Sequence, residues 1–342
     1  MVQTYVFIGY TIFEWISFIL YIRIIYVLFT DKLFKGAFYY FIIAIGISNL
    51  INYLVVFFFY ILPMFDPTAH FYDYFPSGYL IGLIDFFVLF TAYQQDILYT
   101  SICLNRFTAV WQPFLQQTRW NKSFKWHILF SLIMPIPLTI HLLFARGMYL
   151  PIEKNNPGIE KIPILLNFDL WELNSNIVTI VLNSICLIAC FCLNIATFIK
   201  IKQIKKQNPI SIIRNGNNLN NKNSRGGISK VEINLIIMTV VMTAMLMTSL
   251  LYQVLLYSLR NGNFLSNILS SIANIDKINE IFWNQLPWVN DLRALSHPWL
   301  LILLCDDVRQ KSFEPLLSKT WKTPVQSIQL QIDQMARVKP TV

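Results

Sequence analysis

The sequence predicts an integral membrane protein, an all-α seven-transmembrane helix bundle with its N-terminus extracellular and its C-terminus cytoplasmic. Three observations support this fold class. The chain of 342 residues is 55% hydrophobic and only 13% charged, whereas a soluble domain is about 45–50% apolar and about 25% charged. Its apolar residues gather in seven stretches long enough to cross a bilayer. Lys and Arg concentrate in alternate segments between those stretches.

Each predicted span contains about the 20 apolar residues that a helix needs to cross the hydrocarbon layer. The second span is the clearest because it contains no charged side chain. The seventh is the weakest because Asp291 and Arg293 interrupt it and Pro298 removes a backbone donor. The spans are expected at residues 5–29, 37–62, 79–104, 126–149, 174–199, 231–259 and 282–304. They make a bundle of residues 1–304, and a cytoplasmic tail with a short amphipathic helix follows at 305–342.

The distribution of positive charge predicts the orientation. With the amino terminus outside, 20 of the 27 Lys and Arg residues fall in cytosolic segments and five in outer segments. The remaining two, Arg23 and Arg293, lie within spans. Because positively charged loops stay on the cytosolic side of a membrane, this bias places the amino terminus outside. The net charge of +9 therefore belongs to cytosolic loops, and the expected partner is the lipid bilayer, not nucleic acid.

Signatures of catalysis and of metal binding are absent from the sequence. The four histidines have no HExxH spacing, no serine lies in a GxSxG elbow, and no GxxxxGK[ST] loop is present. Cys186 and Cys190 share one helix face, but no His or acid accompanies them, so packing explains them better than metal binding. We therefore expect no enzymatic activity, no cofactor and no metal site.

Ionisable side chains inside the predicted spans are the first candidates for function, because charge in the hydrocarbon layer is costly. Asp85 and Asp96 are about three helical turns apart, so they project to nearly the same side of the third span. Asp96 and Arg293 lie at a similar depth, roughly 15–17 Å from the inner surface at 1.5 Å per residue. One hypothesis is a buried ion pair between them. The alternative, in which each meets water or a backbone carbonyl separately, is equally compatible with the sequence.

Two motifs carry a resemblance to a known family. The inner end of the third span reads NRFTAVWQP at residues 105–113. It resembles the Asn-Arg-aromatic-x-x-Val-x-x-Pro segment of nematode serpentine chemoreceptors, which corresponds to the acidic-Arg-aromatic motif of rhodopsin-like receptors. The seventh span reads NDLRALSHPW at residues 290–299. It is similar to the Asp-Leu-x-x-Leu-Ser-x-Pro segment of serpentine receptor class gamma, a group that includes class V relatives.

The resemblance implies a G-protein-coupled chemosensory receptor in the plasma membrane of a sensory neuron, with Asn105 and Arg106 facing a heterotrimeric G protein. The chain departs from rhodopsin-like receptors at three points. Asn105 replaces the acid, so Arg106 is held in another way or basal signalling is higher. Asn49 replaces an Asp, which weakens the case for a sodium site. No outer cysteine pair is available to staple the long outer loop at residues 150–173.

A receptor of this kind is expected to bind a small-molecule ligand in the outer half of its bundle. Polar and aromatic side chains that we expect at this depth are Asp85, His141, Tyr252, Gln253, Trp288 and Asp291. Packing is the commoner role for any single one of them. Binding would shift a two-state bundle, with Pro298 as a bend point. A seven-span ligand-gated channel or transporter is the alternative function, and a structural protein without a ligand is a third.

Overall fold

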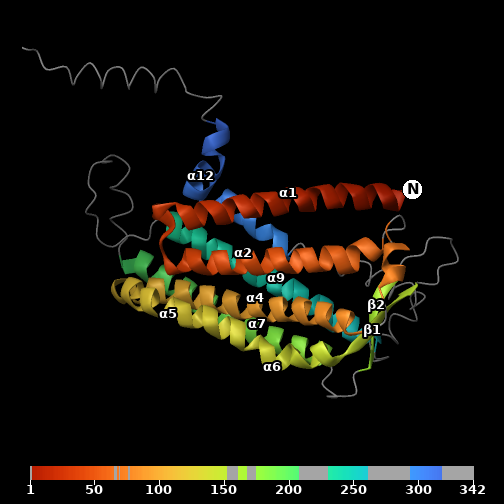
Figure 1. The fold of residues 1–342 in the computed structure, drawn as a ribbon. Helices are drawn as coiled ribbons and strands as arrows, with labels where there is room; N and C mark the ends of the chain where they lie inside the picture. Colours follow the sequence, from red (N-terminus) through yellow and green to blue (C-terminus); the bar gives the residue numbers. More distant parts are fainter. Residues whose placement is uncertain are drawn as a thin grey trace, which may run out of the picture.

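The structure is a computed structural model in which long helices run side by side along one axis (Figure 1). It describes residues 2–64, 68, 70–75, 78–151, 161–167, 175–207, 230–260 and 293–317. The long helices are α1 (Val2–Thr30), α2 (Ala37–Val56), α4 (Tyr79–Trp111), α5 (Pro113–Ile133), α7 (Ser175–Gln207) and α9 (Lys230–Arg260). Residues 293–304 form a further helix.

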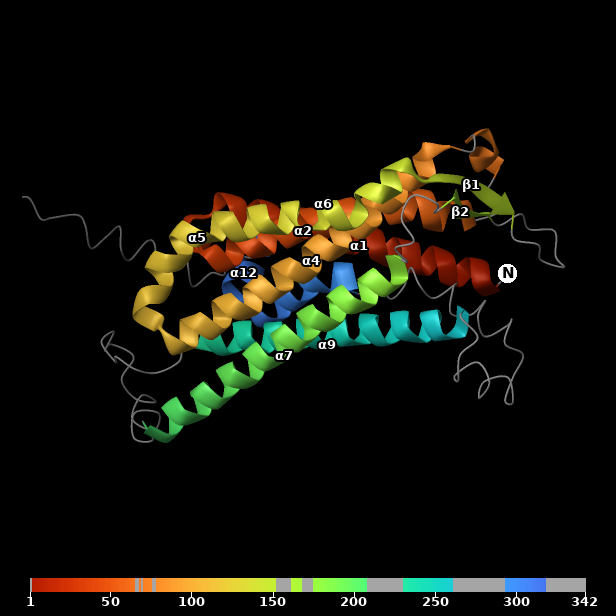
Figure 2. The same cartoon turned by 90° about the horizontal axis from the view of Figure 1, so that it is seen from below.

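The two ends of the bundle differ (Figures 1 and 2). One end carries the amino terminus and a β-hairpin of strands β1 (Arg146–Pro151) and β2 (Lys161–Asn167), and is called the hairpin end below. The other carries the short helix α12 (Asp306–Leu317), and is called the tail-helix end.

Within the described part of the chain, six helices are long and apolar enough to cross a membrane. They are Gly9–Thr30, Ala37–Ile61, Tyr79–Trp111, Arg119–Phe144, Asn176–Ile204 and Glu232–Ser258. The first part of the predicted seventh span, 282–292, lies outside the described residues, and its remainder, 293–304, is helical.

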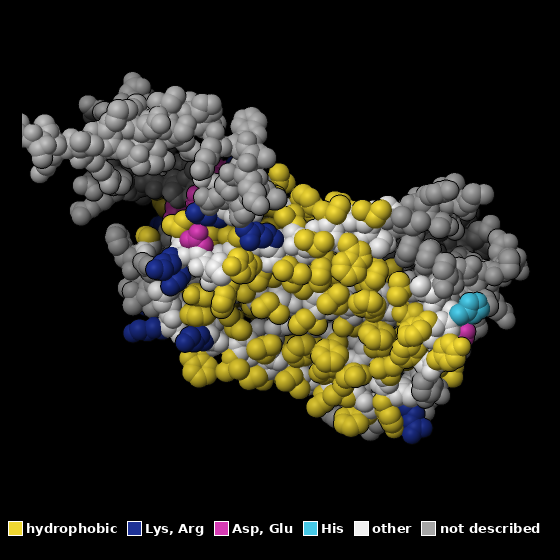
Figure 3. Space-filling view, turned by 45° about the horizontal axis from the view of Figure 1, so that its top comes forward, with side chains coloured by type: hydrophobic (Ala, Val, Ile, Leu, Met, Phe, Trp, Pro, Cys, Tyr) yellow, Lys and Arg dark blue, Asp and Glu magenta, His cyan; other side chains and the backbone are white. Residues whose placement is uncertain are grey.

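Apolar side chains cover the face of the bundle that Figure 3 shows, between its two ends. Ile19 and Ile188 are more than 60% exposed, and so are the larger Phe29 and Trp126. A soluble protein rarely exposes apolar patches of such extent, whereas lipid accepts them. The described helices therefore form a membrane protein, as the composition predicts.

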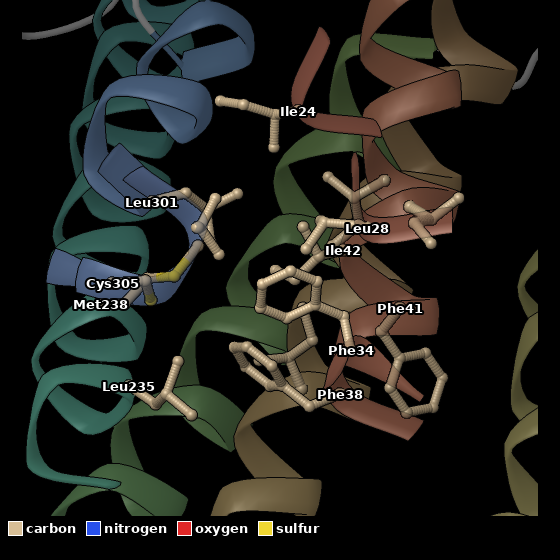
Figure 4. Packing of buried hydrophobic residues seen from close by; sticks show 14 of the residues in the cluster. Ile24, Leu28, Phe34, Phe38, Phe41, Ile42, Leu235, Met238, Leu301 and Cys305 are labelled. Atoms are coloured by element: carbon tan, nitrogen blue, oxygen red, sulfur yellow. The ribbon is translucent and has the colours of Figure 1, made fainter. Parts of the chain in front are cut away.

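Helix α4 lies in the middle of the bundle and touches α2, α5, α7 and α9. At the tail-helix end, side chains of α1, α2, α9 and the helix at 293–304 meet in one buried cluster (Figure 4). Ile24, Phe41 and Leu301 are fully buried there. Because lipid tails are as apolar as these side chains, close van der Waals packing holds the helices together more than the hydrophobic effect does.

The fourth helical segment differs from its predicted bounds of 126–149 at both ends. α5 begins earlier, at Pro113, because proline is well tolerated at the first position of a helix. It is followed by α6 (Pro135–Thr139) and a 3-10 turn (Ile140–Phe144), since prolines lack the donor that continues the helical ladder. Strand β1 then begins at Arg146, in a short apolar run that periodicity alone cannot separate from helix.

At the hairpin end α2 widens into a π-helical turn (Phe57–Ile61). Two tyrosine hydroxyls from outside the bundle donate to its carbonyls: Tyr72 to Phe58, and Tyr149 to Phe59 at 3.3 Å. Burial raises the pKa of both Tyr72 and Tyr149, which keeps these hydroxyls protonated as donors. Turns of this kind are rare and often mark functional sites.

Backbone contacts tie the hairpin to the start of α4. Gly78 and Gly147 exchange two backbone hydrogen bonds of 2.9 Å. Gly82 lies one turn further along α4, where a Cβ atom would come within 2.3 Å of the Leu142 carbonyl oxygen and 2.4 Å of the Ala145 carbonyl oxygen. All five cysteines are free. A backbone bridge and a close glycine contact thus hold the turn before β1 and the start of β1 against α4.

We expect Gly82→Ala to lower the thermal stability of the purified protein, because the new methyl group meets two backbone oxygens that cannot rotate away. Overpacking of this kind costs about 1–3 kcal/mol. Gly9→Ala is the matched control, because Gly9 also lies in a helix and a Cβ there meets nothing within 4 Å. Equal melting temperatures for the two variants would show that α4 and the turn before β1 are not in close contact.

Candidate functional site

Helix α4 turns a row of polar side chains toward the interior of the bundle. Tyr93, Asp96, Tyr99 and Arg106 are each at most 8% exposed. Residues three, four or seven apart share one face of a helix, so this spacing places all four on the buried side. Their partners lie on three other helical segments, which makes α4 the centre of the candidate site.

Asp96 and Arg293 form an ion pair in the interior. The Arg293 Nη2 atom donates to Asp96 Oδ1, and the side chains are 7% and 1% exposed. The guanidinium also lies 5.3 Å from the centroid of the Tyr99 ring. Asp96 Oδ2 and Arg293 Nε have no hydrogen-bond partner among the described residues. The pair is neutral as a whole, and the attraction between its members offsets part of the cost of placing either charge in a membrane.

Neutral polar groups extend this pair into a cluster that joins four helices. Asn49 of α2 donates from Nδ2 to the Tyr21 hydroxyl of α1 and to the Ala294 carbonyl, each at 3.0 Å. The His297 ring, 1% exposed, stacks on Tyr99 with centroids 5.2 Å apart and planes 2° apart. Interhelical hydrogen bonds of this kind add to helix association in membranes.

At the tail-helix end, Arg106 is held by an aromatic ring. Its guanidinium carbon lies 3.9 Å from the centroid of Phe38, at the start of α2. No described carboxylate forms an ion pair with Arg106. The neighbouring Asn105 is 1% exposed, and neither polar atom of its side chain has a partner among the described residues. A cation–π contact thus takes the place of the acid–Arg pair that Asn105 cannot form.

The predicted ligand-binding residues are spread over the hairpin half and do not form one cluster. Asp85 accepts a hydrogen bond from the Tyr60 hydroxyl of the π-helical turn. His141 is half-buried, and its Nε2 has no partner among the described residues. Gln253 accepts from Asn183 Nδ2 at 2.9 Å. Tyr252 is half-buried on α9, Trp288 and Asp291 lie outside the described residues, and Pro298 lies in the helix at 293–304.

A polar stripe on α7 is a feature that our sequence analysis missed. Its members recur at helical spacing, and most are less than 9% exposed. They are Thr179, Asn183, Cys186, Cys190, Asn194 and Thr197. The Tyr93 and Thr179 hydroxyls lie 2.7 Å apart, and Asn194 Nδ2 donates to Thr243 Oγ1 at 2.8 Å. The period-3.6 recurrence of small polar residues in an apolar span was the signal that could have identified it.

The comparison with known proteins identifies the class of this molecule. A family model described as "Serpentine type 7TM GPCR chemoreceptor Srv" matches residues 10–316, from α1 to near the end of α12. No curated protein matches the chain. The match supports the assignment to the nematode serpentine chemoreceptors. It does not extend to class gamma, the group that the motif at residues 290–299 resembles. The chain belongs to the serpentine 7TM GPCR chemoreceptor family Srv.

Proposed function

We propose that this receptor detects a small molecule from outside the cell and activates a heterotrimeric G protein in the cytosol. Its membership of a GPCR chemoreceptor family supports both parts of the proposal. The concentration of Lys and Arg supports an orientation with the hairpin end outside and the tail-helix end in the cytosol. The resemblance to the class gamma group supports a place in the plasma membrane of a sensory neuron.

On this proposal the ligand enters from the hairpin end and binds where α4, α7 and α9 meet. The Tyr93–Thr179 contact joins α4 to α7, and the Asn183–Gln253 bond joins α7 to α9. A ligand that competes for these hydrogen bonds changes the contacts between three helices at once. The other proposed contact residues are Asp85, His141, Tyr252, Trp288 and Asp291.

The observation that supports this mechanism most directly is that one helix carries polar contacts at three depths. α4 meets α7 through Tyr93, the helix at 293–304 through Asp96, and α2 through Arg106. When a bound ligand shifts α4, the surroundings of Arg106 therefore change as well, because Arg106 lies on the same helix. Ligand binding changes the relative populations of two packings of the bundle. Pro298, five residues beyond Arg293, provides the bend.

A ligand screen in cells that co-express a promiscuous G protein tests this function. An active compound should raise G-protein signalling in cells that carry the wild type. It should raise none in cells that carry Arg106→Ala at the same surface level. A ligand-evoked current that survives blockade of G proteins would instead identify a channel.

The orientation has its own test. An epitope tag at the amino terminus should be stained by antibody on intact cells, whereas a tag at the carboxyl terminus should be stained only after permeabilisation. The physical reason is the excess of Lys and Arg in the segments assigned to the cytosol. The reverse staining pattern would place the tail-helix end outside and remove Arg106 from reach of a G protein.

A further inference from the structure

We propose that the ligand of this receptor is a protonated amine, and that its ammonium group binds the carboxylate of Asp85. The ammonium site consists of Asp85, Tyr60 and Tyr149 and is called the acid–tyrosine site below. This inference rests on the proposed function, because it gives the chemical class of the ligand that a receptor of this kind detects. Its test measures binding alone and needs no G protein.

Asp85 is a carboxylate inside a candidate membrane span, and its printed partner is neutral. It lies on α4, where its Oδ1 atom accepts a hydrogen bond from the Tyr60 hydroxyl. Among the described residues, no Lys, Arg or His forms an ion pair with it. Asp96 on the same helix does have a cation, Arg293. Because a charge in a membrane span is costly without an opposite charge, we expect a bound molecule to supply the cation at Asp85.

The cation at the start of β1, Arg146, is held on another face of α4. Its guanidinium carbon lies 5.2 Å from the centroid of the Tyr79 ring, and its Nη2 and Nε atoms donate to the Tyr79 hydroxyl at 3.1 and 3.2 Å. Six residues separate Tyr79 from Asp85, so their side chains project about 120° apart around the helix. Arg146 therefore leaves the Asp85 carboxylate to another cation.

Two tyrosines accompany this carboxylate. Tyr60 belongs to the π-helical turn of α2 and bonds Asp85 directly. Tyr149 comes from β1, and burial, the neighbouring Tyr72 and the Asp85 carboxylate together raise the pKa of its hydroxyl, so Asp85 and Tyr149 are within electrostatic reach of each other. Tyrosine rings attract a cation through their faces. A carboxylate beside tyrosine rings therefore favours an ammonium group over a neutral or anionic ligand.

The acid–tyrosine site lies between the hairpin end and the helix contacts at which the ligand is proposed to act. Asp85, Tyr60 and Tyr149 are each partly exposed, so a small molecule can reach them. Asp85 precedes Tyr93 by eight residues, which is a rise of about 12 Å and a rotation of about 80° along α4. An amine bound at Asp85 can thus extend an apolar body toward Tyr93 and its contact with Thr179.

The test uses the full-length receptor in phosphatidylcholine nanodiscs and matched pairs of amines and alcohols: phenethylamine with phenethyl alcohol, and hexylamine with hexanol. Binding is measured as the rise in melting temperature with increasing concentration, because a ligand of the folded state stabilises it. We expect an amine to stabilise the wild type more than its alcohol does. Asp85→Asn should weaken binding of that amine about thirtyfold, the effect of removing one partner of a desolvated charge pair.

Three comparisons make the result specific to the charge of Asp85. Asp85→Glu keeps the carboxylate and should keep the preference for the amine. Asp73→Asn is the control at the same end of the bundle, because it removes a carboxylate whose side chain is 56% exposed, and it should leave amine binding unchanged. Equal melting temperatures without any ligand establish that the variants are folded.

Two results would overturn the inference. If each alcohol stabilised the wild type as much as its amine, the site would not recognise a cation. If Asp85→Asn and Asp73→Asn had equal effects on amine binding, the attraction would come from the acidic groups of this end in general. Failure of the proposed function looks different: an amine that binds through Asp85 but never activates a G protein leaves the acid–tyrosine site in place. A neutral compound that activates a G protein, while no amine binds, contradicts the amine site alone.

Discussion

Replacing Arg293 by Met should sharply reduce the amount of folded receptor at the cell surface. The change leaves the Asp96 carboxylate fully buried without its cation. Breaking a buried ion pair by removing one partner costs about 3–5 kcal/mol, which is a large part of the stability of a typical protein. Asp96→Asn removes the other charge and should be similarly harmful. Surface staining and melting temperature after purification measure the effect.

The charge-swapped double variant, Asp96→Arg with Arg293→Asp, provides the decisive comparison. We expect it to express better than either single variant, because it restores opposite charges at the same two positions. Asp85→Asn is the matched control on the same helix, since Asp85 is bonded by the neutral Tyr60 hydroxyl and not by a cation. Double-variant expression no better than that of the single variants would contradict a pair that stabilises the bundle.

Phe38→Leu should raise basal G-protein signalling. The change keeps an apolar side chain but removes the ring that lies 3.9 Å from the Arg106 guanidinium. A desolvated cation–π contact contributes about 2 kcal/mol. Losing it would increase the population in which Arg106 is free to meet a G protein by roughly thirtyfold. Ligand-free signalling at matched surface levels measures this population.

Two further variants separate this effect from a general loss of packing. Phe38→Tyr keeps the ring and should leave basal signalling unchanged. Phe41→Leu removes an equally buried ring from the same helix, but Phe41 packs against Trp120 and His127. It should lower stability without raising basal signalling. Equal basal signalling in Phe38→Leu and Phe41→Leu would mean that the ring at position 38 does not restrain Arg106.

The helices themselves were predictable because long apolar runs in a membrane protein leave few alternatives to helix. Their ends were less predictable. α4 continues to Trp111 and α7 to Gln207, past the predicted ends at 104 and 199, because a helix does not stop where the hydrocarbon layer stops. The strand at Arg146–Pro151 was missed because its pairing with β2 depends on residues further along the chain.

The site was predictable only where depth alone decides a contact. Counting residues placed Asp96 and Arg293 at one level, and in the structure their side chains touch. The partner of Arg106 was beyond such counting. Phe38, Tyr39, Tyr40 and Phe41 all lie near the same depth on α2, and only the rotation of α2 against α4 selects Phe38. Asn183 was missed because the span at 174–199 contains no charged side chain to draw attention to its polar face.

The most direct test of the proposed function is nucleotide exchange by a purified G protein in the presence of the purified receptor in nanodiscs. With an active compound from the screen, the wild-type receptor should accelerate exchange, and Arg106→Ala with the same melting temperature should not. Because no cell and no channel current is involved, the result depends only on the receptor and its partner. Exchange that is unaffected by the compound, while the compound still evokes a current in cells, would contradict the account.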